Sequence, residues 1–314
     1  EMSEHKHMGL VSEGFREETL RALKGDLAVG HVRYSTTGSS LLANAQPFVV
    51  SHGGEYYAVA HNGNLVNAVE LRRDLESRGA IFRSTMDTEV VMHLLARNLR
   101  LGLEEALVET LRRVQGAYSL VLATRDKLMG IRDPRGFRPL CLGRLNGSHV
   151  LASETCALDL IEATYVRDVE PGEVLIIDKN GMSSLYPSPE VRPAHCIFEF
   201  IYFARPDSSI FNQNVYLWRK RLGHLLAREY GSLGGDLVMP FPDSGNYAAL
   251  GFAEASRVPF EMGVIRNHYV GRTFIQPSQA MRDFGVRVKL NPVRDLLQGK
   301  KVVLVEDSII RGTT

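Results

Sequence analysis

The chain has 314 residues, of which 44% are hydrophobic, and this is enough for two domains of about 150 residues that each bury a core. Its 37 basic and 36 acidic residues leave a formal charge of +1, which argues against a nucleic-acid or membrane-binding surface. The 3 cysteines are widely spaced and odd in number, and no apolar run approaches the length of a membrane span, so we predict a cytoplasmic protein without disulfides.

Both ends of the sequence are predicted to lie inside a longer protein. The first residue is Glu1, and the last residues form a Gly/Thr loop directly after an apolar run. Globular chains seldom stop within such a turn, because its backbone donors need partners. We therefore interpret residues 1–314 as an interior segment.

The first half of the sequence mixes short strands with helices. Strands are predicted at residues 26–34, 56–60, 118–124 and 174–177. A helix is predicted after Asp87, which is expected to be its N-cap. The apolar residues that would form the buried face of this helix are Val90, Val91, Leu94 and Leu95.

A proline-rich stretch separates the two halves. Residues 186–193 contain three prolines and fit neither the helical nor the strand period, so they are interpreted as a linker. This places one predicted domain at residues 1–190 and a second at residues 195–314.

The pattern changes after this stretch. An amphipathic helix is predicted around Trp218, and a short apolar strand at residues 236–241 precedes an alanine-rich helix at residues 247–255. A further apolar strand is predicted at residues 301–305. Strand, loop and helix in alternation predict a parallel α/β sheet.

The strongest functional pattern follows the last predicted strand. Glu306 and Asp307 would lie at the carboxyl edge of the sheet, where such folds bind ligands. Adjacent carboxylates can accept hydrogen bonds from vicinal sugar hydroxyls, and the backbone of a small-residue loop can bind a phosphate. A surface turn with an acidic cap is the alternative. The loop residues are Ser308, Ile309, Ile310, Arg311, Gly312, Thr313 and Thr314.

This segment resembles the phosphoribosyl pyrophosphate (PRPP) motif of type I phosphoribosyltransferases. The resemblance implies that Glu306 and Asp307 hold the ribose hydroxyls and that the loop at residues 308–314 holds the 5-phosphate. It also implies a Mg²⁺ ion held by Ser244, Glu306 and Asp307. The family usually has two aspartates here, and Glu306 replaces the first.

Two other segments narrow the resemblance to amidophosphoribosyltransferases, glutamine-dependent enzymes of purine synthesis. Residues 242–244 resemble the pyrophosphate loop of that family, and residues 269–279 resemble its flexible lid over PRPP. An ordinary turn and an ordinary hairpin or loop are the alternatives. The lid residues that the resemblance implies are Tyr269, Gly271, Arg272 and Thr273.

The amino-terminal half resembles the glutaminase half of the same family. Arg33 can form a forked pair with the α-carboxylate of glutamine, and Asp87 can accept a hydrogen bond from its α-ammonium. Thr36 is placed in the same glutamine-binding set by the resemblance. Asn62 and the backbone N–H of Gly63 would form the oxyanion hole.

Each of these residues also has a structural alternative. Asp87 could only cap its helix, and Arg33 could be a surface cation. Asn62 and Gly63 could form a type I′ turn. His31 and His61, beside these patterns, are predicted to orient neighbouring backbone rather than to catalyse.

The cysteines do not supply the nucleophile that the resemblance implies. In that family it is a cysteine at the mature amino terminus, whereas Cys141 and Cys156 stand in apolar segments and are predicted to be buried and inert. The chain as written is therefore not expected to hydrolyse glutamine. Cys196 matches a position that ligates a [4Fe–4S] cluster in one branch of the family and is an ordinary cysteine in other members.

The resemblance covers essentially all of the sequence and implies two folds, one mixed α+β and one α/β. The first is an amino-terminal-nucleophile (Ntn) hydrolase αββα sandwich without its leading strand. The second is a type I phosphoribosyltransferase parallel sheet, truncated after the phosphate loop. Without the elements beyond Thr314, PRPP is expected to bind weakly or not at all.

In the complete family enzyme, ammonia from glutamine displaces pyrophosphate from PRPP and gives 5-phosphoribosylamine and glutamate, the first committed step of purine biosynthesis. Purine nucleotide inhibitors and a homotetramer are further implications. Another glutamine amidotransferase is an alternative, but it does not explain the PRPP pattern. A PRPP-sensing regulator is a second alternative, and it would need a DNA-binding domain and no glutamine site.

Overall fold

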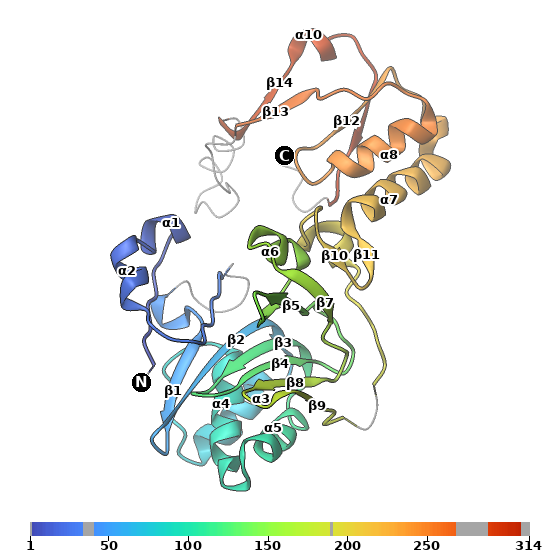
Figure 1. The fold of residues 1–314 in the computed structure, drawn as a ribbon. Helices are drawn as coiled ribbons and strands as arrows, with labels where there is room; N and C mark the ends of the chain where they lie inside the picture. Colours follow the sequence, from blue (N-terminus) through green and yellow to red (C-terminus); the bar gives the residue numbers. More distant parts are fainter. Residues whose placement is uncertain (1, 34–40, 189–190, 268–287, 309–314) are drawn as a thin grey trace. The chain divides into compact units, whose positions relative to one another are not determined.

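The structure is a computed structural model that describes residues 2–33, 41–188, 191–267 and 288–308 (Figure 1). The chain divides into two compact units, unit 1 (Glu1–Cys196) and unit 2 (Ile197–Thr314). The predicted site residues outside the described residues are Thr36, Tyr269, Gly271, Arg272, Thr273, Ile309, Ile310, Arg311, Gly312, Thr313 and Thr314.

Unit 1 contains an antiparallel sheet of 6 strands. In spatial order they are β1 (Phe48–His52), β2 (Glu55–Leu65), β3 (Gly116–Ala123), β4 (Leu128–Arg132), β8 (Val174–Asp178) and β9 (Gly181–Leu185). Three helices pack against one face of this sheet, namely α3 (Ala68–Ser77), α4 (Asp87–Asn98) and α5 (Leu103–Leu111) (Figure 1).

A second, smaller sheet packs against the other face. Its strands are ordered β6 (Ser148–Ala152), β5 (Cys141–Leu145) and β7 (Thr164–Asp168), and α6 (Thr155–Leu160) packs on it. Strand β8 lies between the two apolar cores, because its side chains alternate between the two faces. Val174 and Ile176 belong to the helix-side core, whereas Leu175 and Ile177 belong to the core shared with β5. These layers confirm the mixed α+β fold predicted for this half.

Most predicted elements of unit 1 are confirmed, but two details are wrong. No strand forms over residues 26–33, which have no β partner among the described residues; Val32 is 76% exposed. Asp87 is the first residue of α4 rather than its N-cap, a position held by Met86. The buried face predicted for this helix is confirmed, because Val90, Val91, Leu94 and Leu95 are all buried.

Small helices and strands complete the two units. Those of unit 1 are α1 (Val11–Gly14), α2 (Glu17–Ala22) and two 3₁₀ turns, Leu42–Asn44 and Leu99–Leu101. Those of unit 2 are a π-helical turn (Glu199–Phe203), a 3₁₀ turn (Gly231–Leu233), α10 (Arg294–Leu297) and the strand pairs β10 (Ser209–Ile210) with β11 (Gln213–Asn214) and β13 (Val264–Arg266) with β14 (Leu290–Pro292).

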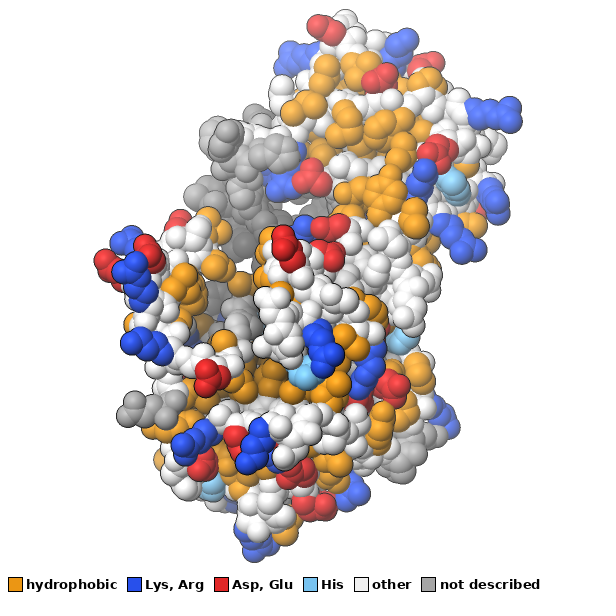
Figure 2. Space-filling view, viewed as in Figure 1, with side chains coloured by type: hydrophobic (Ala, Val, Ile, Leu, Met, Phe, Trp, Pro, Cys, Tyr) orange, Lys and Arg blue, Asp and Glu red, His pale blue; other side chains and the backbone are white. Residues whose placement is uncertain are grey.

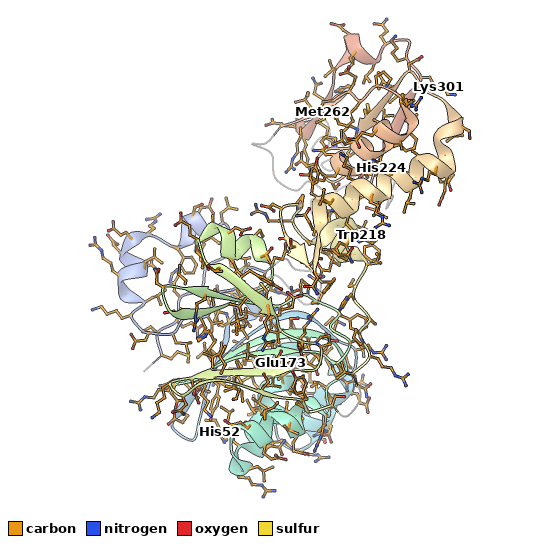
Figure 3. All side chains as sticks on the ribbon, turned by 45° about the vertical axis from the view of Figure 1, so that its right-hand side comes forward. His52, Glu173, Trp218, His224, Met262 and Lys301 are labelled. Carbon is orange, nitrogen blue, oxygen red and sulfur yellow. The ribbon has the colours of Figure 1, made fainter. Side chains whose placement is uncertain are left out.

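Unit 2 is built around a pair of parallel strands, as the sequence predicts. β12 (Leu237–Pro240) pairs in parallel with β15 (Val302–Val305), and α8 (Asn246–Ser256) packs against both strands. The predicted amphipathic helix is α7 (Val215–Tyr230), which carries Trp218 (Figure 3). The ring of Trp218 stacks on that of Phe200.

Helices α7 and α8 cross closely at two glycines. A Cβ atom on Gly223 would lie 1.9 Å from the carbonyl oxygen of Ala248, and one on Gly251 would lie 1.9 Å from that of Lys220. Only glycine permits this approach, so the crossing holds α8 in a fixed position behind the two strands.

The surface agrees with the sequence composition. Basic and acidic side chains are interspersed over the visible face in Figure 2, in keeping with the formal charge of +1. Among the described helices, none combines the length and the apolar character that crossing a bilayer requires.

Candidate functional site

In unit 1, the predicted oxyanion-hole residues lie inside a strand. Asn62 pairs with Ser119 and Gly63 pairs with Tyr118, across β2 and β3. The type I′ turn considered for this dipeptide is therefore wrong, because both residues take part in the β ladder. Gly63 has a φ of +154°, and a Cβ atom there would lie 2.1 Å from the carbonyl oxygen of Ala117. The position thus requires glycine.

The side chain of Asn62 has a specific partner. Its Oδ1 atom accepts a hydrogen bond of 3.2 Å from Nη2 of Arg138, which lies on the loop after β4. Sequence reasoning did not identify Arg138, because residues 132–138 read only as a turn rich in Pro and Gly. Nothing in a turn pattern indicates that one of its arginines reaches a residue 76 positions away.

Asp87 connects the start of α4 to the end of β2. Its Oδ2 atom accepts a hydrogen bond of 2.9 Å from the backbone N–H of Leu65. Its Oδ1 atom lies 3.5 Å from Nδ1 of His61. Burial opposes ionisation of this carboxyl, but the contacts with His61, Leu65 and Thr88 outweigh burial and lower the pKa of Asp87. The structure therefore places an ionised carboxylate beside the strand that carries Asn62 and Gly63.

The turn before Asp87 is held by two polar side chains that the sequence analysis missed. Glu89, which is 2% exposed, accepts hydrogen bonds from the backbone N–H groups of Arg83 at 2.7 Å and Ser84 at 2.8 Å. Asn44 exchanges two hydrogen bonds with Thr85, at 2.9 and 3.1 Å. A glutamate in the first turn of a helix ordinarily indicates a surface position, so only its tertiary contacts reveal this role.

Arg33 lies close to the same group of residues. Burial lowers the pKa of His31, and the charge of Arg33 and a hydrogen bond to the backbone of His61 also act on this imidazole. Arg33 and His31 line a pocket of about 170 Å³ together with Gln46. Gln46 in turn accepts a hydrogen bond of 2.6 Å from the backbone N–H of His61. Arg33 and Asp87 are thus both neighbours of the His31 and His61 pair.

In unit 2, the predicted phosphoribosyl residues follow the two parallel strands. The backbone N–H of Phe241 donates to the carbonyl of Val305 at 2.9 Å, so the loop after β12 and the acidic pair after β15 leave the sheet at the same edge. This confirms the predicted carboxyl-edge arrangement. Gly245 fits closely under this edge, because a Cβ atom there would lie 2.5 Å from the oxygen of Val305.

The acidic pair has unusual electrostatics. Burial and the neighbouring Asp307 raise the pKa of Glu306 to about 8, although the backbone N–H of Asp307 donates to its carboxylate at 3.1 Å. The Oδ2 atom of Asp307 is buried and has no hydrogen-bond partner among the described residues. Two adjacent carboxyls, one of them with an unsatisfied buried oxygen, fit a site for a hard cation.

Three other polar residues lie near this edge. Asp243, in the loop after β12, forms an ion pair with Arg266 of β13. Ser308 donates to Oδ1 of Asp307 at 3.1 Å. Ser244, the third predicted magnesium residue, lies next to Asp243 in the loop at this edge and is half-buried.

The three cysteines do not gather into a cluster site. Cys141 is buried, which raises its pKa to about 12, and its Sγ donates to the carbonyl of Ala152. The burial predicted for Cys156 is wrong, because this residue is half-buried in α6 and its Sγ contacts Glu154 at 3.8 Å. Cys196 is also half-buried. Over the described ranges, no group of three or more His, Cys, Asp and Glu side chains is arranged to hold a metal ion.

Comparison with known proteins finds one matching family model and relatives that match nearly the whole chain. Residues 31–160 match the family model described as a glutamine amidotransferase domain. The chain is 55% identical to amidophosphoribosyltransferase 2, chloroplastic, of Arabidopsis thaliana, over 98% of this chain and 55% of that protein. It is 48% identical to the amidophosphoribosyltransferase of Methanocaldococcus jannaschii, over 99% of this chain and 69% of that protein.

A solved structure is similar to this chain over most of its length. The glutamine PRPP amidotransferase from B. subtilis, complexed with ADP and GMP, superposes with a TM-score of 0.90 and 47% identity, over 98% of this chain and 67% of that chain. The chain spans about half the length of the plant relatives it matches.

Proposed function

The chain belongs to the amidophosphoribosyltransferase family, and on that premise we propose that it takes part in transferring the amide nitrogen of glutamine to C1 of PRPP. The products of this reaction are 5-phosphoribosylamine, glutamate and pyrophosphate. The proposal rests on one observation, that the ionised Asp87 lies beside Asn62 and Gly63 at the end of β2. The amidophosphoribosyltransferase names of the relatives favour this function over another amidotransferase or a PRPP-sensing regulator.

In unit 1, the proposed steps are the binding of glutamine and the stabilisation of its tetrahedral intermediate. Arg33 pairs with the α-carboxylate of glutamine, Thr36 assists it, and Asp87 accepts from the α-ammonium. Asn62 and the N–H of Gly63 donate to the oxyanion that forms when the side-chain amide is attacked. None of Cys141, Cys156 and Cys196 is proposed as the attacking thiol, because the family resemblance assigns that role to a cysteine at a mature amino terminus and these three lie within the chain.

In unit 2, the proposed role is to hold PRPP. Glu306 and Asp307 accept hydrogen bonds from the ribose hydroxyls, residues 308–314 bind the 5-phosphate, and residues 269–273 close over the substrate. Mg²⁺, held by Ser244, Glu306 and Asp307, would neutralise the charge of the departing pyrophosphate. Ammonia from unit 1 forms the new bond to C1 as the C1–O bond to pyrophosphate breaks.

Further parts of the proposal rest on the family. Purine nucleotides are proposed as inhibitors, supported by the solved relative in complex with ADP and GMP, and a homotetramer is proposed as the assembly. A cytoplasmic location is also proposed, although plant relatives carry the word chloroplastic in their names. An iron–sulfur cluster at Cys196 would need three ligands from outside these 314 residues, because Cys141 and Cys156 point to other partners.

The proposed function is tested in a completed protein, defined as residues 1–314 joined to the flanking segments of the B. subtilis relative. We expect this protein to release pyrophosphate from PRPP only when glutamine or ammonia is supplied. Because the two units have separate roles, glutamine hydrolysis and ammonia-dependent pyrophosphate release are measured separately. Absence of both reactions in the folded, purified protein would overturn the proposal.

The first variant tests the glutamine site. Asp87→Asn keeps an oxygen that can accept from Leu65 but removes the charge, so we expect glutamine to bind about 10- to 100-fold more weakly. Calorimetry with glutamine measures this loss. Asp74→Asn is the matched control, because Asp74 forms surface pairs with Arg78 and Arg113. Equal glutamine affinities for the two variants would remove Asp87 from the site.

The second test concerns the pH dependence of the acidic pair. Because the pKa of Glu306 is raised to about 8, this carboxyl is protonated at neutral pH. The stability that the protonated carboxyl contributes is lost as the pH rises from the ordinary pKa of a glutamate to about 8. A cation competes with that proton, so Mg²⁺ affinity should rise between pH 6 and about 8 and then level off. Carboxyl ¹³C NMR of Glu306 with and without Mg²⁺ measures the pKa and the competition with the cation, and urea unfolding across this pH range measures the stability. Glu306→Gln should abolish both pH dependences. A Glu306 carboxyl that titrates near its ordinary pKa would contradict this prediction.

A further inference from the structure

The loop that carries Arg138 is organised around two buried charged side chains. The carboxylate of Asp133, which is 0% exposed, accepts from the backbone N–H groups of Arg135 at 2.9 Å and Phe137 at 3.2 Å. The guanidinium of Arg132 donates to the carbonyls of Arg138 at 2.9 Å and Gly136 at 3.0 Å. These bonds from within the loop fix its backbone.

The same loop is attached to the strand next to Asn62. The Oγ atom of Ser119 donates to the carbonyl of Arg138 at 3.2 Å, and Ser119 is the residue paired with Asn62 across β3 and β2. The backbone of Arg138 is therefore held near Asn62 by contacts that do not involve the Arg138 side chain. The guanidinium then needs only to reach across one strand to donate to Oδ1 of Asn62 at 3.2 Å.

This contact determines which end of the Asn62 amide is the donor. A guanidinium carries only donors, so it can face Oδ1 but not the NH₂ group of the amide. A rotation of the amide by half a turn would bring two donors together and break the bond. The Nδ2 group of Asn62 is therefore turned away from Arg138, and the positive charge polarises the amide and strengthens Nδ2–H as a donor.

We propose that Arg138 is a positioning residue for the oxyanion hole, which holds the Asn62 amide with its NH₂ group toward the reacting carbonyl of glutamine. Arg138 does not touch the substrate in this proposal and acts only through Asn62. In the flipped orientation, Asn62 would present an oxygen to the developing negative charge and would raise the barrier instead of lowering it. The inference rests on the proposed glutaminase function of unit 1.

A double-mutant cycle in the completed protein tests this role. We expect Arg138→Ala to lower kcat for glutamine hydrolysis about 10- to 100-fold and to change KM by less than about threefold. In the Asn62→Ala background, Arg138→Ala should cost nothing further, because the group it positions is gone. Guanidinium ion added to Arg138→Ala should restore part of kcat, and it should restore none in the double variant.

The controls separate positioning from general structure. Arg135→Ala removes an exposed arginine from the same loop and should leave kcat and KM unchanged. If Arg138→Ala does not fold, Arg138→Lys and Arg138→Gln replace it, and the lysine variant should keep clearly more activity.

Three results would overturn the proposal. They are additive losses in the cycle, a rise in KM at constant kcat, or equal activities of the lysine and glutamine variants. A completed protein that folds but hydrolyses no glutamine would instead overturn the proposed function, and this inference with it.

Discussion

Replacement of Gly63 by alanine is expected to destabilise unit 1 by about 3–5 kcal/mol and to abolish glutamine hydrolysis. The added Cβ atom would lie 2.1 Å from the carbonyl oxygen of Ala117 and 2.8 Å from Nε2 of His61. Neither atom can move away freely, because Ala117 belongs to the β3 ladder and His61 is buried beside Thr88 and Asp87. Strand β2 must therefore shift, and the N–H of Gly63 moves with it.

The control for this variant is a glycine that also has a positive φ but has open space around its Cβ position. Gly53, in the turn between β1 and β2, has a φ of +62° and no atom within 4 Å of a Cβ position. Gly53→Ala is expected to cost about 1–2 kcal/mol from backbone strain alone and to keep glutamine hydrolysis. Urea unfolding and glutaminase assays of the completed protein compare the two variants. Equal losses of stability would show that the close contact with Ala117 does not constrain this strand.

The fold was predictable where local pattern and tertiary environment agree. The apolar spacing after Asp87 indicates a helix with one buried face, and its four apolar residues are buried in the core. The apolar runs that end near Pro240 and Val305 indicate buried parallel strands, and these two residues are paired in the structure. In each case the residues that define the pattern also make the contacts.

The wrong predictions, and the excluded turn alternative for Asn62 and Gly63, arise where a distant part of the chain decides the local structure. Asn62 and Gly63 have the local signature of a turn, but their backbones pair with β3, more than 50 residues later in the sequence. Asp87 has the signature of an N-cap, yet it is the first residue of the helix, and its carboxylate accepts from Leu65 at the end of β2 as well as contacting Thr88 of its own helix. Residues 26–34 have the alternation of a strand. In the structure, residues 26–33 pair with no strand among the described residues.

The site shows the same limit. The residues proposed to contact the substrates were named by resemblance, since their residue types match the chemistry of a bound amino acid or sugar phosphate. The residues that hold them in place were not predicted, because Glu89, Asn44 and Arg138 act through backbone groups and side chains of other segments. Such support becomes visible only when burial and hydrogen-bond partners are known.

Replacement of Gly245 by alanine is expected to have the corresponding effect on unit 2. This glycine has an ordinary backbone conformation, so the substitution introduces no φ strain. Its Cβ atom, however, would lie 2.5 Å from the oxygen of Val305 and 2.9 Å from that of Phe241. The loop that carries Ser244 must then separate from the strand that delivers Glu306. We expect a loss of about 2–4 kcal/mol of stability and at least about 100-fold weaker binding of PRPP with Mg²⁺ in the completed protein.

Gly231→Ala is the matched control, because that glycine also lacks a strained φ and its Cβ would meet only Ser256, at 3.9 Å. Calorimetry with PRPP and Mg²⁺, together with glutamine hydrolysis, compares the two variants. Since the contacts of Gly245 lie within unit 2, glutamine hydrolysis without PRPP should be unchanged in Gly245→Ala. Likewise, ammonia-dependent pyrophosphate release should survive in any Gly63→Ala protein that still folds. If Gly245→Ala bound PRPP normally, the edge formed by β12 and β15 would not be the phosphoribosyl site, whatever the fate of the glutamine site.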